Sequence, residues 1–390
     1  MCIPVSTRYF TRRCVTERVA GIYIHVPFCQ GRCIYCDFYS TTEGEEWKSR
    51  YVDALLAELR MRRDELPLAR VHSIYIGGGT PSQLPARALS GILNEVCRLF
   101  PVDSDAEVTV EANPDDVTPE WLAALSHTPV NRLSMGVQSF DDALLRLIRR
   151  RHTAQQAVCA VEQAARHGIS NVSIDLIYGL PTQTMEQWQA DVRQALALDV
   201  QHLSAYSLSY EEGTPLWRML EQGRIEEADE ELSLCMYEHL IDATRAAGFT
   251  HYEISNFCRS GRHSQHNSAY WHGVPYLGFG PGAHSYDGMR TRRWNLSDLK
   301  GYVQAAGSMP PHQSEVLTDD ELYDETVMTR LRTSEGLSLD LLTAAYRAYC
   351  MAQAEPHLRA GRLEQAGSTI RLTRQGIFTS NDIISDLMRA

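Results

Sequence analysis

The sequence predicts an α/β protein: a partial barrel of the (β/α)6 type, followed by a small C-terminal α+β domain. Two observations predict the barrel. Short β-branched or aromatic runs recur six times before residue 210, and segments with a helical spacing of apolar residues lie between them. The residues best suited to chemistry fall at or just beyond the ends of these runs, where β/α folds place their active sites.

The six predicted strands are GIYIHV from Gly21, VHSIYI from Val71, AEVTVEA from Ala106, NRLSMGV from Asn131, NVSIDLIYG from Asn171 and QHLSAYSL from Gln201. The helices predicted between them include Trp47–Glu65, Leu84–Leu99, Ala154–His167 and Met185–Leu198. Consecutive strands are separated by long crossovers, so we expect them to be parallel, with right-handed connections.

The sequence changes character after Phe249. Residues 256–294 contain seven aromatic side chains, where the chain-wide 8% predicts about three, and four of the fourteen histidines. Glycines recur through this segment and favour a loop over a helix. We expect the aromatic side chains of such a loop to pack on one another or on a flat ligand.

The C-terminal region is predicted to contain helices over Thr318–Leu331 and Leu339–Tyr349 and a hairpin in GRLEQAGSTIRLTRQG, a pattern that resembles a winged helix. From Glu315 onward there are eight Arg, no Lys and twelve acidic residues, which favours a packing or lid role over DNA binding. The predicted regions are an N-terminal extension (1–18), the barrel (19–250), a connecting region (251–314) and the C-terminal domain (315–390).

Composition restricts the possible partners and compartment. Hydrophobic residues make up 44% and charged residues 22%, as in ordinary globular proteins, and the formal charge of −12 disfavours nucleic acid as a partner. No apolar run approaches the ~18 residues that a membrane span needs, so an integral membrane protein is not expected. The first twenty residues lack the apolar core of a signal peptide, and we expect a cytoplasmic protein; an organellar transit peptide is the less favoured alternative.

Three of the ten cysteines crowd into eight residues as Cys29-x3-Cys33-x2-Cys36, whereas the other seven are scattered singly. Three thiolates at this spacing can bind three irons of a [4Fe-4S] cluster and leave the fourth iron without a protein ligand. A structural zinc site is the alternative, and it would need a fourth Cys or His. His25 is the only candidate near the three cysteines in sequence.

The cysteine loop HVPFCQGRCIYCDF resembles that of the radical S-adenosylmethionine (SAM) superfamily, and further motifs narrow the resemblance to its oxygen-independent coproporphyrinogen III oxidase-like family. These motifs are YIGGGTPS (75–82), VEANPDD (110–116), LSMGVQSFDD (133–142), IDLIYGLPTQT (174–184) and HNSAYW (266–271). They occur in order and cover nearly the whole chain. The resemblance implies the radical SAM type of partial barrel, with the C-terminal domain of that family.

The resemblance also implies cofactors, namely the [4Fe-4S] cluster on Cys29, Cys33 and Cys36 and a SAM molecule on its open iron. The implied SAM contacts are Tyr23, Tyr35, Gly77, Gly78, Gly79, Thr80, Glu111, Gln138, Arg150 and Asp175. The glycines would let the backbone approach the methionine amine, Glu111 would bind ribose hydroxyls, and Arg150 suits a carboxylate because its guanidinium is a fixed fork. No catalytic residue is assigned.

Two features separate this chain from the porphyrinogen-oxidising enzymes of the family. Position 38 is Phe where those enzymes carry a fourth cysteine, and only about twenty residues precede the first predicted strand. Conversely, HNSAYW resembles an element associated with heme binding, which implies His266 as an iron ligand, Asn267 beside it, and Tyr270 and Trp271 stacking on the porphyrin. From the residues alone a structural histidine is the commoner interpretation of His266, and three further histidines stay possible ligands: His263, His272 and His284.

The predicted function is that of a heme chaperone that binds a [4Fe-4S] cluster, SAM and heme. It would transfer heme to heme-requiring proteins, with membrane respiratory enzymes among the expected acceptors, and it would need an electron donor if radical chemistry occurs. The alternative is a radical SAM enzyme of tetrapyrrole metabolism, either an oxygen-independent coproporphyrinogen III dehydrogenase or a heme-opening methyltransferase. Radical modification of tRNA is disfavoured by the charge.

Overall fold

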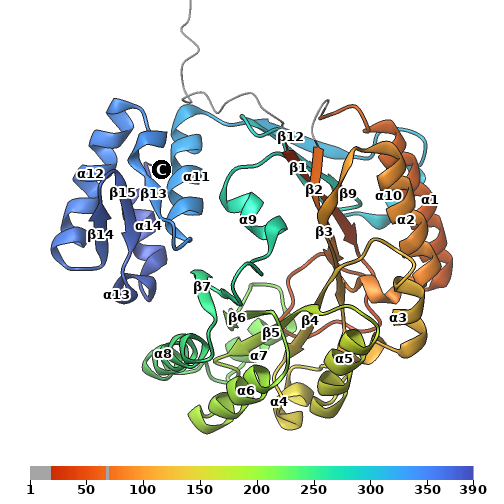
Figure 1. Ribbon diagram of the computed structural model, residues 1–390, viewed down its shortest axis with the longest axis horizontal. Helices are drawn as coiled ribbons and strands as arrows, with labels where there is room; N and C mark the ends of the chain where they lie inside the picture. Colours follow the sequence, from red (N-terminus) through yellow and green to blue (C-terminus); the bar gives the residue numbers. More distant parts are fainter. Residues whose placement is uncertain (1–18, 67–69, 390) are drawn as a thin grey trace, which may run out of the picture.

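The computed structural model describes residues 19–66 and 70–389 (Figure 1). The predicted N-terminal extension, with Cys2 and Cys14, lies outside the described residues. Each of the six predicted runs forms a strand, and these strands are parallel and adjacent in chain order. They are β1 (Val19–Val26), β2 (Arg70–Gly78), β3 (Val102–Ala112), β4 (Arg132–Gln138), β5 (Asn171–Tyr178) and β6 (His202–Ser207). The predicted fold class is confirmed.

Helices cover the convex side of the curved sheet (Figure 1). They are α1 (Glu45–Met61), α2 (Ala86–Leu99), α3 (Pro119–Leu125), α5 (Ala154–Arg166), α6 (Met185–Ala197) and α8 (Glu230–Ala246). The helix α2 illustrates why these helices pack on the sheet. One face of α2 is a buried apolar stripe with the spacing i, i+3, i+4 and i+7, formed by Leu89, Ile92, Leu93 and Val96. Two short helices, α4 (Asp142–Leu147) and α7 (Pro215–Glu221), instead pack against the loop that follows β1. Short 3₁₀ turns follow β2 (Pro81–Gln83) and β3 (Pro114–Asp116).

The connecting region differs from the predicted loop, because it contributes strands to both edges of the barrel sheet. On one edge β7 (Thr250–Glu253) and β8 (Asn256–Cys258) extend the sheet from β6; on the other, β9 (Tyr276–Phe279) lies parallel to β1 and is followed by antiparallel β10 (His284–Tyr286), β11 (Thr291–Asn295) and β12 (His312–Val316). The glycines mark turns between these short strands. Gly280, for example, has a positive φ of 97° directly after β9.

HNSAYW is part of a helix, α9 (Gln265–Trp271), and the prediction of a loop was wrong there too. Figure 1 shows α9 inside the concave side of the sheet, facing the C-terminal region. A further short helix, α10 (Leu299–Gln304), packs on α1 at the outer surface. Within the two described ranges, no helix is both long and apolar enough to cross a membrane.

The C-terminal region has its own hydrophobic core, which includes Val327, Leu331 and Ile383. Its elements are α11 (Asp319–Leu331), β13 (Leu337–Ser338), α12 (Ala344–Arg359), β14 (Leu363–Ala366), β15 (Thr369–Leu372), α13 (Arg374–Ile377) and α14 (Ser380–Leu387). The first predicted helix and the hairpin are confirmed. The second helix is not as predicted, because a 3₁₀ turn over Leu339–Leu341 precedes α12, whose N-terminus is capped by the Thr343 hydroxyl.

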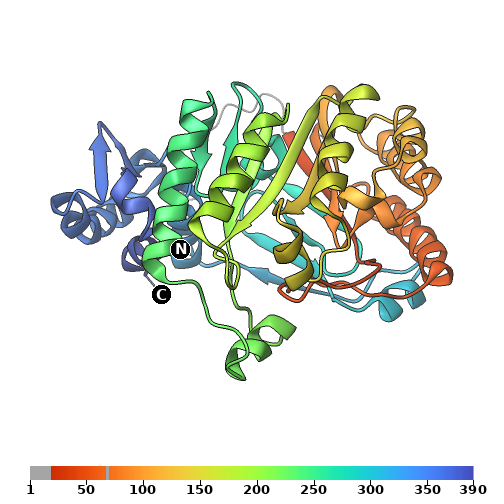
Figure 2. The same cartoon turned by 90° about the horizontal axis from the view of Figure 1, so that it is seen from below.

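The C-terminal region lies beside α8 (Figure 2), and its helix α11 contacts α9. Phe378 packs edge-on against Tyr237 of α8, and Arg374 forms an ion pair with Asp242 of the same helix. The boundaries predicted between the regions stay a prediction.

Candidate cofactor site

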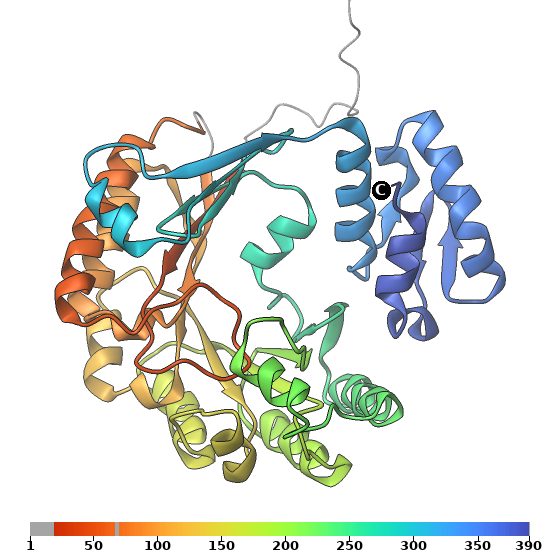
Figure 3. The same cartoon turned by 180° about the vertical axis from the view of Figure 1, so that it is seen from behind.

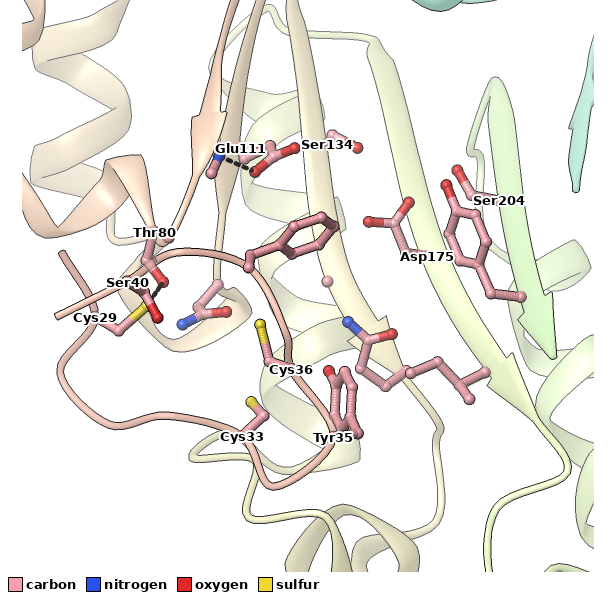
Figure 4. Close-up of a pocket in the computed structure, with 18 of the residues that line it drawn as sticks. Cys29, Cys33, Tyr35, Cys36, Ser40, Thr80, Glu111, Ser134, Asp175 and Ser204 are labelled. Atoms are coloured by element: carbon pink, nitrogen blue, oxygen red, sulfur yellow. Dashed lines mark hydrogen bonds between the residues drawn. The ribbon is translucent and has the colours of Figure 1, made fainter. Parts of the chain in front are cut away.

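A pocket of about 410 Å³ opens at the carboxyl ends of the parallel strands. The loop between β1 and α1, residues 27–44, crosses this end of the barrel and carries the three clustered cysteines (Figure 3). Most of the residues implied to bind the cluster and SAM line the pocket: Cys29, Cys33, Tyr35, Cys36, Gly78, Gly79, Thr80, Glu111, Gln138, Arg150 and Asp175. Figure 4 shows the cysteines on one side and the carboxylates of Glu111 and Asp175 on the other.

The cysteine loop is fixed by its buried apolar side chains. Ile34, between the second and third cysteines, is 2% exposed and packs with Ile148 and Leu216. The backbone carbonyl of Ile34 accepts a hydrogen bond from the Leu216 N–H at 2.9 Å. The loop is therefore positioned by the fold itself.

The chemistry of the three thiols fits an iron–sulfur cluster. Burial raises the pKa of Cys29, and it raises that of Cys36 to about 11, so both are neutral thiols unless a cation compensates the thiolate charge. Among residues 19–66 and 70–389, the pocket lining contains no further cysteine and no histidine. Within the described chain no three Cys, His, Asp or Glu side chains already stand in a metal-binding arrangement.

The glycine run Gly77–Gly79 leaves space for the cysteine loop and for neighbouring side chains, in addition to any contact with a ligand. The N–H of Gly79 donates to the Val26 carbonyl at 2.8 Å, and a Cβ at position 79 would stand 2.9 Å from the backbone oxygen of Phe28. Gly78 has a positive φ of 109°, and a Cβ there would stand 2.5 Å from the His25 ring. Gly77, which does not line the pocket, leaves room for Tyr75 and Glu111 in the same way.

Glu111 and Asp175 form the acidic side of the pocket. The carboxylate of Glu111 accepts hydrogen bonds from the Tyr75 hydroxyl at 2.6 Å and the Gly78 N–H at 3.1 Å. Burial is the main cause that raises the pKa of Glu111 to about 7, with the charge of Asp175 adding to it. Burial likewise raises the pKa of Asp175 to about 6. Both groups titrate near neutral pH and can accept hydrogen bonds from hydroxyl groups of a ligand.

Gln138 and Arg150 lie where the backbone is irregular. Gln138 ends β4 at a register shift and has a positive φ of 70°, a strained conformation that is common at functional sites. The guanidinium of Arg150 donates to the Asn113 side chain at 2.7 Å and to the Cys33 sulfur at 3.4 Å. A Cβ at Gly136 would come within 3.1 Å of both side chains, so this glycine leaves room for them.

Arg132 is a pocket residue that none of the sequence motifs predicts. It is 2% exposed, lines the pocket from β4, and contacts the Thr109 hydroxyl at 3.5 Å. Its positive charge acts against the upward pKa shifts of Glu111 and Asp175. An arginine within the apolar run NRLSMGV is the sequence signal that could have found it, because an arginine is rarely buried without a polar partner.

Tyr23 does not line the pocket. Its ring stacks on those of Tyr75 and His266, and its hydroxyl lies 3.0 Å from Nδ1 of His25.

The structure separates the residues of HNSAYW. Asn267 lines the cofactor pocket, whereas Tyr270 and Trp271 line a second cavity on the other side of α9. His266 lines neither: its Nδ1 lies 2.9 Å from the Ser73 hydroxyl and its Nε2 lies 2.8 Å from the Tyr270 hydroxyl. Burial lowers the pKa of His266 to about 3, so the ring is neutral and both of its nitrogens are engaged.

Comparisons with known proteins agree with this architecture. The model of the radical SAM superfamily matches residues 23–195, and that of the HemN C-terminal domain matches residues 317–379. The solved structure of coproporphyrinogen III oxidase (HemN) from Escherichia coli, described as a radical SAM enzyme, is similar with a TM-score of 0.83 and 25% identity, over 95% of this chain and 90% of that one. The barrel and its pocket are thus those of a radical SAM protein.

Two curated relatives define the family more closely. The heme chaperone HemW of Mycobacterium tuberculosis is 38% identical over 94% of this chain and 94% of its own length. The heme chaperone HemW of Bacillus subtilis is 35% identical over 93% of this chain and 97% of its own length. The chain belongs to the HemW family of radical SAM proteins, as the motifs predicted, and its cofactors are a [4Fe-4S] cluster and SAM.

A cluster held by Cys29, Cys33 and Cys36 would supply one-electron reduction of the SAM sulfonium. The described residues supply the surroundings for this chemistry: three thiols on a fixed loop, a cationic Arg150 beside Cys33, and carboxylates on the opposite wall.

Proposed function

We propose that this protein is a heme chaperone, which binds heme and delivers it to heme-requiring proteins. The observation that carries the proposal is its similarity to the HemW heme chaperones of two bacteria over more than nine tenths of the chain. Respiratory enzymes in membranes are the acceptors we expect, with the protein itself acting from the cytoplasm.

Within this function, we assign the cluster to Cys29, Cys33 and Cys36. SAM is assigned to the opposite wall of the same pocket, with Glu111 and Asp175 toward its hydroxyl groups and Arg150 toward its carboxylate. The fixed cysteine loop and the two carboxylates that titrate near neutral pH support this arrangement. We assign no catalytic residue.

Residue 38 supports a chaperone over a porphyrinogen oxidase. The side chain of Phe38 is at the pocket and 64% exposed, and it provides no thiol beside the cluster.

The proposal is tested by two assays on the same anaerobically reconstituted protein. In the first, protein loaded with heme is mixed with a heme-free b-type cytochrome, and the absorbance bands of the cytochrome report transfer. We expect transfer at a rate above that of free heme. In the second, coproporphyrinogen III, SAM and a reductant are supplied, and we expect no protoporphyrinogen. Steady multiple turnover in the second assay, or no transfer in the first, would overturn the proposal.

A further inference from the structure

The second cavity, about 480 Å³ in volume, lies between α9 and α11 and is a separate space from the cofactor pocket. This volume is typical of sites for small molecules and cofactors. Aromatic and aliphatic side chains dominate its walls: Tyr270, Trp271, Tyr276, Tyr286, Leu322 and Met328. A cavity of this kind suits a flat, largely apolar ligand.

A histidine also lines this cavity. His272 follows α9 directly, and its Nδ1 lies 2.6 Å from the backbone carbonyl of Ser268, to which it donates a proton. This bond fixes the orientation of the ring and leaves Nε2 as the nitrogen that can bind a metal once it has given up the proton that it shares with Glu335. A histidine that binds a metal commonly donates its other ring N–H to a carbonyl in this way.

Nε2 of His272 lies 2.8 Å from the carboxylate of Glu335, whose side chain is 69% exposed. The contact ends on a carboxylate that is largely in solvent and contributes little stability, so a ligand can displace the carboxylate at small cost. His266 differs directly, because one of its ring nitrogens contacts the buried hydroxyl of Ser73 on β2 and the other contacts the half-buried hydroxyl of Tyr270, on α9 itself.

Cationic groups stand at the same cavity. Arg292 lines it and forms an ion pair with Glu325 at 2.7 Å, while its Nε is buried and has no hydrogen-bond partner in the described chain. Arg330 lines it from α11 and donates to the His272 carbonyl at 3.2 Å. A flat apolar ligand with carboxylate groups at its edge would match both the walls and these charges.

We propose that this cavity is the heme site, with Nε2 of His272 as the iron ligand in place of Nε2 or Nδ1 of His266. The assignment rests on the proposed function, which supplies heme as the cargo. Binding then forms one bond from iron to Nε2, breaks the contact of Nε2 with Glu335, and releases any proton on Nε2 to solvent. Tyr270 and Trp271 line the site, while α9 separates it from the SAM pocket that Asn267 faces.

The test is a titration of the full chain with hemin, read by the Soret band and by the electron paramagnetic resonance signal of histidine-ligated iron. We expect His272→Ala to weaken binding at least tenfold and to abolish the histidine signal. His266→Ala is the matched comparison, and it should keep the signal in the fraction of protein that folds. Glu335→Gln should tighten binding, since it removes the competitor for Nε2; a purely structural His272–Glu335 pair would give no such gain.

A second variant does not depend on the ligand atom. Thr326→Trp places a large side chain in the cavity and should prevent heme binding, whereas Ser385→Trp, at an exposed position of α14, should not. Iron content and SAM binding should be unchanged in both. The inference is overturned if hemin still binds to Thr326→Trp, or if the histidine signal survives in His272→Ala and is lost in His266→Ala. Either result would leave the proposed function intact, because the wild-type protein would still bind hemin. Failure of the wild-type protein to bind hemin would instead contradict the proposed function.

Discussion

The carboxylate of Glu107, on β3, accepts a hydrogen bond from the backbone N–H of His266 at 3.1 Å. The same carboxylate accepts from the N–H of Gln265 at 3.0 Å and lies 3.5 Å from the Ser264 hydroxyl. A buried strand residue thus caps the first turn of α9, where a helix leaves its N–H groups without intrahelical partners. This contact holds the helix that separates the two cavities inside the barrel.

Replacing Glu107 should therefore loosen α9. Glu107→Ala leaves the buried N–H of His266 and the partly buried N–H of Gln265 without an acceptor, and we expect a loss of about 2–4 kcal/mol in the free energy of unfolding, measured with urea. Glu107→Gln keeps one acceptor oxygen and should lose less. Equal losses in the two variants would show that the carboxylate does not act as a cap.

The barrel could be predicted from the sequence because parallel strands that are buried on both faces appear in it as apolar runs. Ile22, Ile24 and Val26 of β1 are each at most 1% exposed. The edge strands were not predicted because they are short. β8 and β10 have three residues each, too few to show the alternation of apolar and polar residues that marks a strand.

The site was predictable only where one residue type implies one chemistry. Three cysteines at short spacing indicate a cluster before any fold is known. His266 and His272, by contrast, are six residues apart, and only the resemblance of HNSAYW to a known element favoured His266 over His272. What distinguishes them is the partner of each nitrogen, and those partners, Ser73 and Glu335, are far away along the chain.

A buried ion pair joins α1 to the edge strands. Glu58 accepts from Arg62 at 2.8 Å, from the Tyr302 hydroxyl at 2.6 Å, and from the Asn295 amide at 2.7 Å. Glu58→Leu leaves the buried guanidinium of Arg62 short of a partner, and we expect it to cost about 3–5 kcal/mol in unfolding free energy.

The double variant Glu58→Leu/Arg62→Met should be less destabilised than the sum of its single variants, because neither buried charge remains. Urea unfolding of the four proteins in the cycle measures the difference. Additive losses would mean that the two side chains act independently.

The acidic wall of the cofactor pocket predicts a pH dependence for the protein without SAM. The pKa of Glu111 is about 7 in the folded chain against 4.5 ordinarily, and that of Asp175 is about 6 against 3.8. Between its ordinary pKa and its pKa in the folded chain, each carboxyl group binds more protons in the folded state than in the unfolded state. The contribution of the two groups to the free energy of unfolding is therefore highest at low pH and falls as pH rises from about 4 to 7. Glu111→Gln should flatten this dependence in thermal unfolding followed across that range; an unchanged slope would contradict the assignment.

The cluster assignment predicts that Cys33→Ala loses most of its bound iron while the chain stays folded. The loop is held by Ile34 and by the backbone bond between Leu216 and Ile34, neither of which depends on the thiol. Iron and sulfide are measured after anaerobic reconstitution, and circular dichroism reports the fold. Cys159→Ala, at an exposed cysteine on α5, is the matched control and should keep its iron. Four irons retained by Cys33→Ala would mean that another side chain supplies the third ligand.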